Sequence, residues 1–420
     1  MAKGIGIDFG TTNSSIAVAQ DERTSETVLF RTGAGTTETY RSVLYFEPKT
    51  PGVSGPRAIE RYLAADEKGR LIQSLKSFLA SRTFTGTSIY GRQFPVEDLI
   101  TIMLRDLRIQ AEEQIGAFDG PVVVGRPVRY SNASGEDDNQ FALDRLKRAL
   151  DKAGIGQVIF EYEPVAAAYF YESRLDHDEL ILIGDFGGGT SDFSLLRVGP
   201  SARREGTHRI LGTEGVALAG DAFDARIIRN LISLKLGRTS EYRSLDKVLP
   251  MPEWVYSDLE RWHYLSFLKS NATVQMLRSI ETHSFEPEKI AALLHVVQND
   301  LGFYLHRSVQ GLKTELSSEP VGTFVFEDHV LQMRGRVKRP TFEGWIEEDL
   351  QKIRGCLDRL LAACDTRVGE VDRVFLTGGS SQVPAVRRIF EQRFGTEKIS
   401  SGNEFTSVAR GLALRAAVSE

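Results

Sequence analysis

One pattern occurs twice in this chain of 420 residues and constrains its fold more than any other feature. An apolar strand over 5–9 carries Asp8 near its end and is followed by the turn Gly10-Thr11-Thr12-Asn13. A second apolar strand over 180–183 leads in the same way to Asp185 and a glycine-rich turn. The two aspartates stand 177 residues apart, far beyond a solenoid period. The repeat therefore indicates a duplication at the scale of a domain, with two lobes that share one core topology.

Three glycine turns follow predicted strands and have the composition of anion sites. Glycine lets a backbone approach an anion without a clash from Cβ, and successive N–H groups form a concave anion site. The turns are Gly10–Asn13, Gly187–Thr190 and Gly378–Ser380, and Pro384 opens a predicted helix after the third. One such turn alone could be an ordinary tight connection. Two acid-bearing turns in two lobes favour a triphosphate site whose carboxylates hold hydrated Mg²⁺.

Composition excludes several classes of protein. Apolar residues make up 41% and charged residues 26%, which is typical of a globular protein. The net charge of −5 argues against binding nucleic acid through bulk charge. No apolar run approaches the roughly 18 residues of a membrane-spanning helix, and no signal-peptide pattern opens the chain. Cys356 and Cys364 are expected as free thiols in a reducing cytosol, so a cytoplasmic location is predicted, without a nucleic-acid or membrane partner.

Helical patterns fill the remaining chain and predict an α/β fold. Apolar residues recur at helical spacing over 141–150 and 346–361. The stretch 238–301 has a different texture: it contains no glycine and carries Trp254 and Trp262. We interpret it as a helical insertion on the second lobe.

The motifs match one known family in chain order. Residues 7–14, Ile-Asp-Phe-Gly-Thr-Thr-Asn-Ser, resemble the first phosphate loop of the DnaK-type heat-shock chaperones, within the actin, hexokinase and chaperone ATPase superfamily. Residues 185–192 resemble the second phosphate loop. Four further segments resemble family motifs, at 161–169, 218–224, 374–384 and 408–411. Together the segments span nearly the whole chain, which makes the resemblance specific.

The resemblance implies an actin-like ATPase fold, in which two duplicated lobes with ribonuclease H-like cores surround a nucleotide cleft. Lobe I would comprise 1–168. Lobe II would comprise 169–390 and include the helical insertion at about 238–301. Residues 391–420 would return to lobe I.

The resemblance also implies roles for individual residues in binding ATP or ADP with Mg²⁺. Asp8 and Asp185 would hold the ion, mainly through its waters. Glu163 and Asp192 would order the attacking water or the metal shell, and Thr190 would place a hydroxyl near the γ-phosphate. The other expected nucleotide contacts are Gly10, Thr11, Thr12, Asn13, Gly187, Gly188, Gly189, Gly220, Asp221, Lys313, Ser317, Gly378, Gly379, Ser380 and Gln382.

Lys76, within the segment 74–79, resembles the family's catalytic lysine. A cation beside the γ-phosphate stabilises the charge that develops in phosphoryl transfer. Pro127 matches a proline that the family uses to couple its lobes. The adenosine side departs from the family pattern at three positions. Gln310 replaces a glutamate, Gln382 an arginine and Phe405 an aspartate. These changes weaken charge and stacking around the adenosine and put the preference for adenine in question.

Only nine residues follow Gly411. We therefore expect no peptide-binding domain, lid or acidic linker, as in the short bacterial branch of YegD-type proteins. The predicted function is Mg-ATP binding with slow hydrolysis, used as a conformational switch in a chaperone-like or regulatory role. The insertion, with Trp254, Trp262 and Tyr264, is a candidate surface for a protein partner, although aromatic residues at helical spacing more often belong to a core. A small-molecule kinase and an actin-like filament protein of the same superfamily stay open as alternatives.

Overall fold

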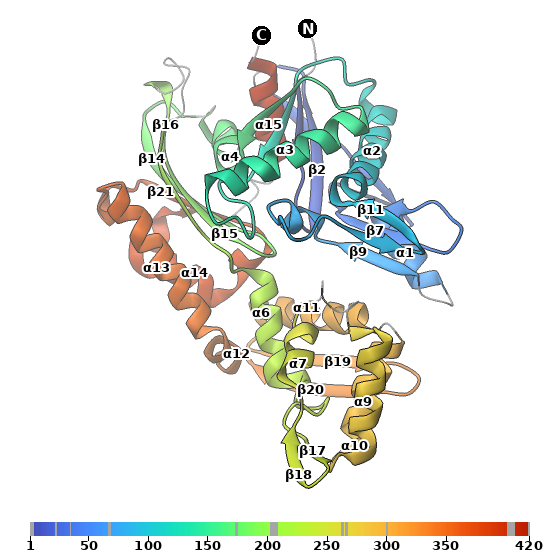
Figure 1. The fold of residues 1–420 in the computed structure, drawn as a ribbon. Coiled ribbons are helices and arrows are strands. Elements are labelled where there is room, and N and C mark those ends of the chain that lie inside the picture. Colours follow the sequence, from blue (N-terminus) through green and yellow to red (C-terminus); the bar gives the residue numbers. More distant parts are fainter. Residues whose placement is uncertain are drawn as a thin grey trace. The chain divides into compact units, whose positions relative to one another are not determined.

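The computed structural model describes residues 4–21, 23–33, 35–65, 69–172, 175–201, 209–261, 264, 268–299, 301–400 and 408–418. The chain divides into two compact units (Figure 1). Unit 1 consists of Met1–Ala217, Ile353–Ser381 and Arg387–Glu420, and unit 2 of Leu218–Lys352 and Gln382–Val386. The predicted lobes end at other positions, 168 and 390, and that division stays a prediction.

Unit 1 contains two sheets that have the same strand order and directions. The first has the order β13-β12-β1-β2-β3, with β6 also paired to β2, and the second has the order β16-β15-β14-β21-β22. In each sheet one strand, β1 or β14, pairs antiparallel with the strand that follows it and parallel with a later one. The strands are β1 (Gly4–Asp8), β2 (Asn13–Ala19), β3 (Ser25–Thr27), β6 (Tyr40–Arg41), β12 (Val122–Arg126), β13 (Val158–Tyr162), β14 (Glu179–Phe186), β15 (Ser191–Val198), β16 (Arg209–Val216), β21 (Arg373–Thr377) and β22 (Ile399–Ser400).

The two acid-bearing turns occupy equivalent places in these sheets. Asp8 ends β1 at its junction with β2, and Asp185 lies one residue before the end of β14 at its junction with β15. Both predicted strand–turn–strand segments are therefore confirmed.

The helix α15 (Val408–Val418) packs unusually close to β1 and to α4 (Glu163–Glu172), and it lies beside β2 in Figure 1. A Cβ atom on Gly6 would stand 2.1 Å from the carbonyl oxygen of Ala409, and one on Gly411 would stand 1.8 Å from that of Ala166. Glycine is thus required at both contacts. This close packing holds α4, whose first residue is Glu163, against the first sheet.

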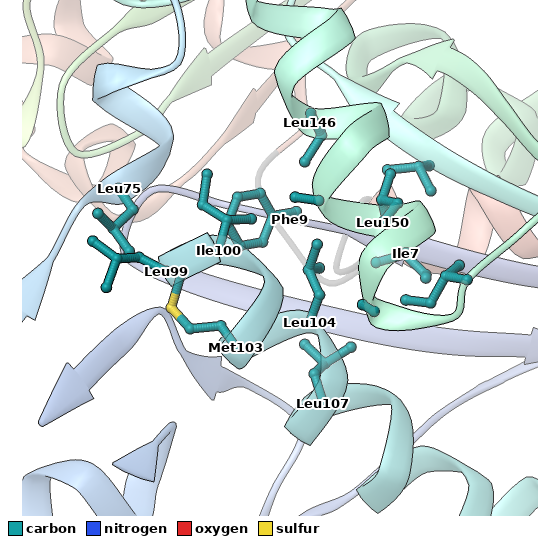
Figure 2. Packing of buried hydrophobic residues seen from close by; sticks show 14 of the residues in the cluster. Ile7, Phe9, Leu75, Leu99, Ile100, Met103, Leu104, Leu107, Leu146 and Leu150 are labelled. Carbon is teal, nitrogen blue, oxygen red and sulfur yellow. The ribbon is translucent and has the colours of Figure 1, made fainter. Parts of the chain in front are cut away.

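A second group of elements covers the other side of β1 in unit 1. Figure 2 shows side chains of the 3-10 turn η1 (Leu75–Phe78), of α2 (Val96–Ile115) and of α3 (Glu136–Ala153) meeting around Phe9. Helix α3 begins with three acidic residues, which favour a helix N-terminus, and it stops at Gly154, whose φ of 79° suits a left-handed cap. It confirms the helix predicted over 141–150.

The remaining elements of the first 100 residues are short strands and one helix. They are β4 (Phe30–Thr32), β5 (Gly35–Thr37), β7 (Val43–Phe46), β8 (Val53–Ser54), α1 (Pro56–Ala64), β9 (Arg70–Gln73), β10 (Gly86–Ile89) and β11 (Arg92–Pro95). Towards the C-terminus the chain adds α13 (Glu347–Ala363), η4 (Val368–Glu370), η5 (Gly379–Gln382), α14 (Pro384–Phe394) and η6 (Thr396–Lys398). Helix α13 confirms the helix predicted over 346–361, and α14 begins at Pro384 as predicted.

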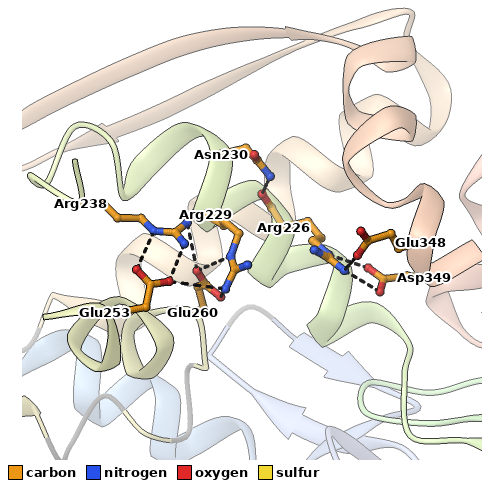
Figure 3. A network of polar contacts seen from close by, with 8 residues as sticks. All are labelled: Arg226, Arg229, Asn230, Arg238, Glu253, Glu260, Glu348 and Asp349. Carbon is orange, nitrogen blue, oxygen red and sulfur yellow. Dashed lines mark hydrogen bonds and ion pairs between the residues drawn. The ribbon is translucent and has the colours of Figure 1, made fainter.

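Unit 2 combines helices with two hairpins. Its elements are α6 (Gly220–Ile227), the π-helical turn η2 (Ile228–Ile232), β17 (Glu241–Ser244), β18 (Lys247–Pro250), α7 (Glu253–Leu259), α9 (Asn271–His283), α10 (Pro287–Gln298), α11 (Gly302–Ser318), β19 (Val321–Glu327), β20 (Gln332–Lys338) and α12 (Arg339–Trp345). Figure 3 shows ion pairs that link side chains of α6, η2 and α7 with others in this unit.

The predicted helical stretch 238–301 is only partly helical in the described ranges. Helices α7, α9 and α10 lie within it, but β17 and β18 form an antiparallel hairpin. Burial alternates along β17, which is the period of a strand, and Leu245 at the tip adopts a φ of 55° that a helix does not allow. Trp254 is 46% exposed, whereas Trp262 lies outside the described residues. Among the described helices, none is both long and apolar enough to cross a membrane.

Candidate functional site

A buried ion pair joins two of the predicted site residues of unit 1. The Nζ of Lys76 lies 2.8 Å from Oε1 of Glu163, and the two side chains are only 9% and 12% exposed. Lys76 comes from η1, and Glu163 opens α4. Burial alone would lower the pKa of Lys76, but the carboxylates of Glu163 and Asp8 raise it above its ordinary value. The lysine is therefore charged, and the fold brings it to an acid 87 residues away in the sequence.

Asp8 and Asp185 are half-buried, and the charges of Lys76 and Glu163 act on both. Burial raises the pKa of Asp8 from 3.8 to about 7; the charges of Glu163 and Asp185 add to the rise, and Lys76 opposes it. Burial and Glu163 also raise the pKa of Asp185, while a hydrogen bond from Thr377 opposes the rise. The Oγ1 of Thr377 donates to Oδ1 of Asp185 over 2.9 Å, from the neighbouring position on β21. The strand ends thus concentrate negative charge.

Asp192 adds a further carboxyl group on the return strand. It stands opposite Asp185 in the β14–β15 ladder. Burial raises its pKa to about 7; a hydrogen bond with Thr190 lowers it, and the charges of Asp185 and Glu163 raise it. Gly215 on β16 leaves room for this carboxyl group, because a Cβ there would stand 2.6 Å from Oδ1 of Asp192.

The excess of carboxyl groups over positive charge fits a cation. Lys76 is the positive group that acts on Asp8, Asp185 and Asp192 alike. In the ranges that the structure describes, no three His, Cys, Asp or Glu side chains gather as a direct metal-binding set. Mg²⁺ usually keeps several waters and takes one or two carboxylates plus phosphate oxygens. The residues therefore fit a hydrated Mg²⁺ better than an ion enclosed by protein ligands.

The first glycine turn is braced by a residue that the sequence analysis did not single out. The Oγ of Ser42 donates to the carbonyl oxygen of Gly10 over 2.8 Å, and its backbone N–H donates to that of Thr12 over 2.9 Å. A Cβ on Gly10 would stand 2.0 Å from the carbonyl oxygen of Asn13, so the turn needs glycine. The side chain of Asn13 accepts a hydrogen bond from Arg41. Ser42 lies 32 residues from Gly10 and has no local pattern that would have marked it.

The second and third glycine turns meet. The backbone N–H of Gly187 donates to the carbonyl oxygen of Thr190 over 3.0 Å and closes the turn that contains Gly188 and Gly189. Gly378 adopts a φ of 81°, and a Cβ there would stand 2.1 Å from the carbonyl oxygen of Phe186. Gly379 and Ser380 follow in η5. The fold thus gathers both turns at the ends of β14 and β21.

The predicted residues of unit 2 form a separate cluster. The Nζ of Lys313 lies 2.8 Å from Oδ1 of the buried Asp224 and donates to the carbonyl oxygen of Gly220 over 3.1 Å. Burial raises the pKa of Asp224, and Lys313 and Gln310 oppose the rise. The Oγ of Ser317 donates to the carbonyl oxygen of Lys313.

Three further positions were singled out in the sequence as nucleotide contacts or as departures from the family pattern. Asp221 lies in the first turn of α6. Gln382 belongs to unit 2 through the segment Gln382–Val386. Phe405 lies outside the described residues.

A mixed α/β fold with two sheets of equal strand order defines the class, and comparison with known proteins identifies the family. The model of the family described as Hsp70 protein matches residues 64–242 and 272–420. The chain belongs to the Hsp70 family, which confirms the resemblance inferred from the motifs.

Curated relatives match along almost the whole chain. The chaperone protein DnaK of Thermotoga petrophila is 26% identical over 416 residues, which cover 99% of this chain and 59% of that protein. DnaK of Thermosipho melanesiensis is 24% identical over 417 residues, with coverage of 99% and 59%. DnaK of Deinococcus proteolyticus is 26% identical over 442 residues, with coverage of 100% and 59%. The chain thus spans 59% of the length of these relatives.

Proposed function

We propose that this chain binds ATP with Mg²⁺, hydrolyses it slowly and uses the nucleotide as a conformational switch in a chaperone-like role. The observation that carries the proposal is the buried Lys76–Glu163 pair beside Asp8 and Asp185, where two sheets of the same order end in glycine turns. Membership of the Hsp70 family supports it, because the matched relatives are named as chaperones.

The charges of the cluster suit phosphoryl transfer to water. Asp8 and Asp185 would hold Mg²⁺ through its water shell, and the ion, when bound, would neutralise phosphate charge. Lys76 would stabilise the negative charge that develops on the transferred group. Asp192 has a pKa of about 7, so it is suited to accept a proton from water near neutral pH. Glu163 would hold Lys76 in place through their 2.8 Å contact.

The glycine turns would supply neutral contacts to the phosphates. The backbones of Thr11, Thr12 and residues 187–189 lie in tight turns beside the acids, where N–H groups can face an anion. Thr190 would direct its hydroxyl to the γ-phosphate. The Lys313 cluster of unit 2, with Gly220 and Ser317, would contact the nucleoside side.

The output of the switch would pass to a protein partner through the insertion. Trp254 is half exposed, and exposed tryptophan is a frequent anchor of protein interfaces. We also propose a cytoplasmic location, which the two free cysteines, Cys356 and Cys364, support.

Calorimetry with ATP, ADP and GTP, each with and without Mg²⁺, tests the central proposal, together with phosphate release. We expect Mg-dependent binding, and we expect Asp8→Asn and Asp185→Asn to weaken it about 10–100-fold, as for other groups that orient a metal's ligands. Asp144→Asn is the matched control, because Asp144 is an exposed carboxylate on α3 of the same unit. Absence of heat with every nucleotide would refute the proposal.

Two further readouts separate the alternatives. Turnover that depends on an added phosphoryl acceptor would indicate a kinase, and sedimentation that depends on nucleotide would indicate a filament. Tryptophan fluorescence that stays flat at saturating Mg-ATP would remove the switch and leave a static nucleotide-binding protein.

A further inference from the structure

Lys76 lies on a short element that by itself does little to fix the direction of the lysine side chain. The turn η1 has four residues, and 3-10 turns have poorer hydrogen-bond geometry than α-helices. It starts after Ser74, whose φ of 53° is unusual for a residue with a side chain. Something outside the turn must hold it for Lys76 to keep one position.

Arg145 of α3 reaches the chain just after Lys76. Its Nη1 donates to the carbonyl oxygens of Phe78 and Leu79, each over 3.2 Å, and to that of Ser81 over 3.1 Å. These are the second, third and fifth residues after the lysine. One guanidinium group therefore binds three carbonyl oxygens along the exit from the turn, and Arg145 is 2% exposed.

Glu97 of α2 orients this guanidinium group. The Nε of Arg145 donates to Oε1 of Glu97 over 3.0 Å, and its Nη2 donates to Oε2 over 3.3 Å. Burial would raise the pKa of Glu97, but the hydrogen bond with Arg145 lowers it and the net pKa lies below its ordinary value. The pair is thus ionised, and two parallel bonds leave Nη1 facing the carbonyls.

Apolar packing connects the same three elements beneath the polar contacts. Leu75 of η1, Leu99 of α2 and Leu146 of α3 belong to one buried cluster (Figure 2). Each lies within two residues of Lys76, Glu97 or Arg145 in the sequence. The two helices and the turn therefore hold one another on both the polar and the apolar side.

We propose that Arg145 is a positioning residue for Lys76: by binding the carbonyls of Phe78, Leu79 and Ser81 while Glu97 holds its fork, it sets where the lysine ammonium lies. This inference rests on the proposed role of Lys76 in hydrolysis. A merely structural arginine would stabilise the fold without acting through the lysine. The two interpretations therefore predict different activities for a variant that also lacks Lys76.

Single-turnover phosphate release on the full chain tests the inference. Arg145→Lys keeps the charge but cannot bind Glu97 and the carbonyls in the same fork geometry. We expect kcat to fall about tenfold, since small misplacements of catalytic groups cost up to about 10²-fold. The affinity for Mg-ATP in calorimetry should stay within about twofold. In a Lys76→Ala background the same change should have no further effect on kcat.

Arg148→Lys is the matched control. Arg148 also donates to Oε1 of Glu97 over 3.0 Å, but its side chain is 54% exposed and this bond runs to α2 and not to the turn. Its kcat should equal that of the parent. Glu97→Gln leaves Arg145 in place and keeps the length of the side chain at position 97, but removes its charge. We expect it to lower kcat as much as Arg145→Lys does. In the Lys76→Ala background it should cause no further loss. This second route serves if Arg145→Lys does not fold.

The outcomes distinguish this inference from the proposed function. If Lys76→Ala turns over at the parent rate, the catalytic assignment of the lysine fails, and the inference fails with it. If Lys76→Ala loses activity while Arg145→Lys and Glu97→Gln keep it, only the inference is overturned. A loss of the same size in both backgrounds would also overturn it, because Arg145 would then act independently of Lys76.

Discussion

The two units of this protein treat buried charge in opposite ways. In unit 1, one lysine acts on Asp8, Asp185 and Asp192 and is already bonded to Glu163, so negative charge is left over. Burial raises the pKa values of the three aspartates, and the neighbouring carboxylates add to the rise. Holding these acids together lowers the stability of the folded protein when they are ionised.

In the network of unit 2 that Figure 3 draws, every arginine binds at least one carboxylate directly. Arg226 binds Asp349 through two bonds of 2.9 and 3.0 Å and reaches Glu348 at 3.0 Å. Arg229 binds Glu260 in the same forked manner. Balanced, forked ion pairs satisfy one another and need no ligand. The comparison teaches that excess charge, and not charge itself, marks the candidate site.

Removing the lysine should have the largest effect. Lys76→Ala should still bind Mg-ATP but release phosphate about 10²–10³ times more slowly, since it loses a preorganised charge at the reacting group. Phosphate release and calorimetry measure the two quantities. Lys152→Ala, which removes an exposed lysine of α3 that pairs with Asp98, should behave as the parent. A parent-like rate in Lys76→Ala would mean that the lysine is misassigned.

The unbalanced acids should make the metal-free protein less stable as pH rises. The pKa values of Asp8 and Asp192 are about 7 when folded and 3.8 in a free chain, so the folded state binds more protons between these values. Stability from these groups is present below about pH 4 and is lost as pH rises to about 7. Urea midpoints from pH 5 to 8 in chelator should show this decline. Asp8→Asn should flatten it, and Asp144→Asn should not; an equally steep profile in Asp8→Asn would contradict the assignment.

Breaking the forked Arg226–Asp349 pair of unit 2 should affect stability alone. Arg226→Ala leaves Asp349, a side chain that is 3% exposed, without its forked partner. We expect a loss of about 2–3 kcal/mol in the free energy of unfolding, because a buried carboxylate without its partner is costly. Denaturant unfolding measures it, and phosphate release per folded molecule should not change. Recovery of stability in the variant that also carries Asp349→Ala would confirm that the unpaired carboxylate is the cause. Reduced turnover in the folded Arg226→Ala variant would contradict a purely structural role for the pair.

The smallest effect is expected at the rim of the same network. Arg238 lies 2.6 Å from Glu253, whose side chain is 59% exposed. Arg238→Ala should cost about 0–1 kcal/mol, and salt should reduce the difference further. Unfolding at low and high ionic strength gives the comparison. A loss of stability as large as that of Arg226→Ala would show that solvent exposure does not determine how much each ion pair of this network contributes.

The sequence by itself determined the parts whose geometry is local. The acid-bearing turns, the helices at 141–150 and 346–361 and the helix that starts at Pro384 follow from periodicity, from glycine and from proline, which act on neighbouring backbone. The order of these motifs along the chain also revealed the family. The same local signals failed at 241–250, where a short alternating stretch lay within a longer helical pattern.

Only the tertiary structure decided which charges meet. Lys76 and Glu163 were both identified as candidates, but nothing within their own segments states that they pair across 87 residues. Nothing in the sequence around Ser42 or Arg145 singles them out, because an isolated serine or arginine is usually a surface residue. Their roles arise because the sheets and helices bring distant backbone carbonyls within reach. Burial then sets the pKa values, and burial is a property of the packed whole and not of any one segment.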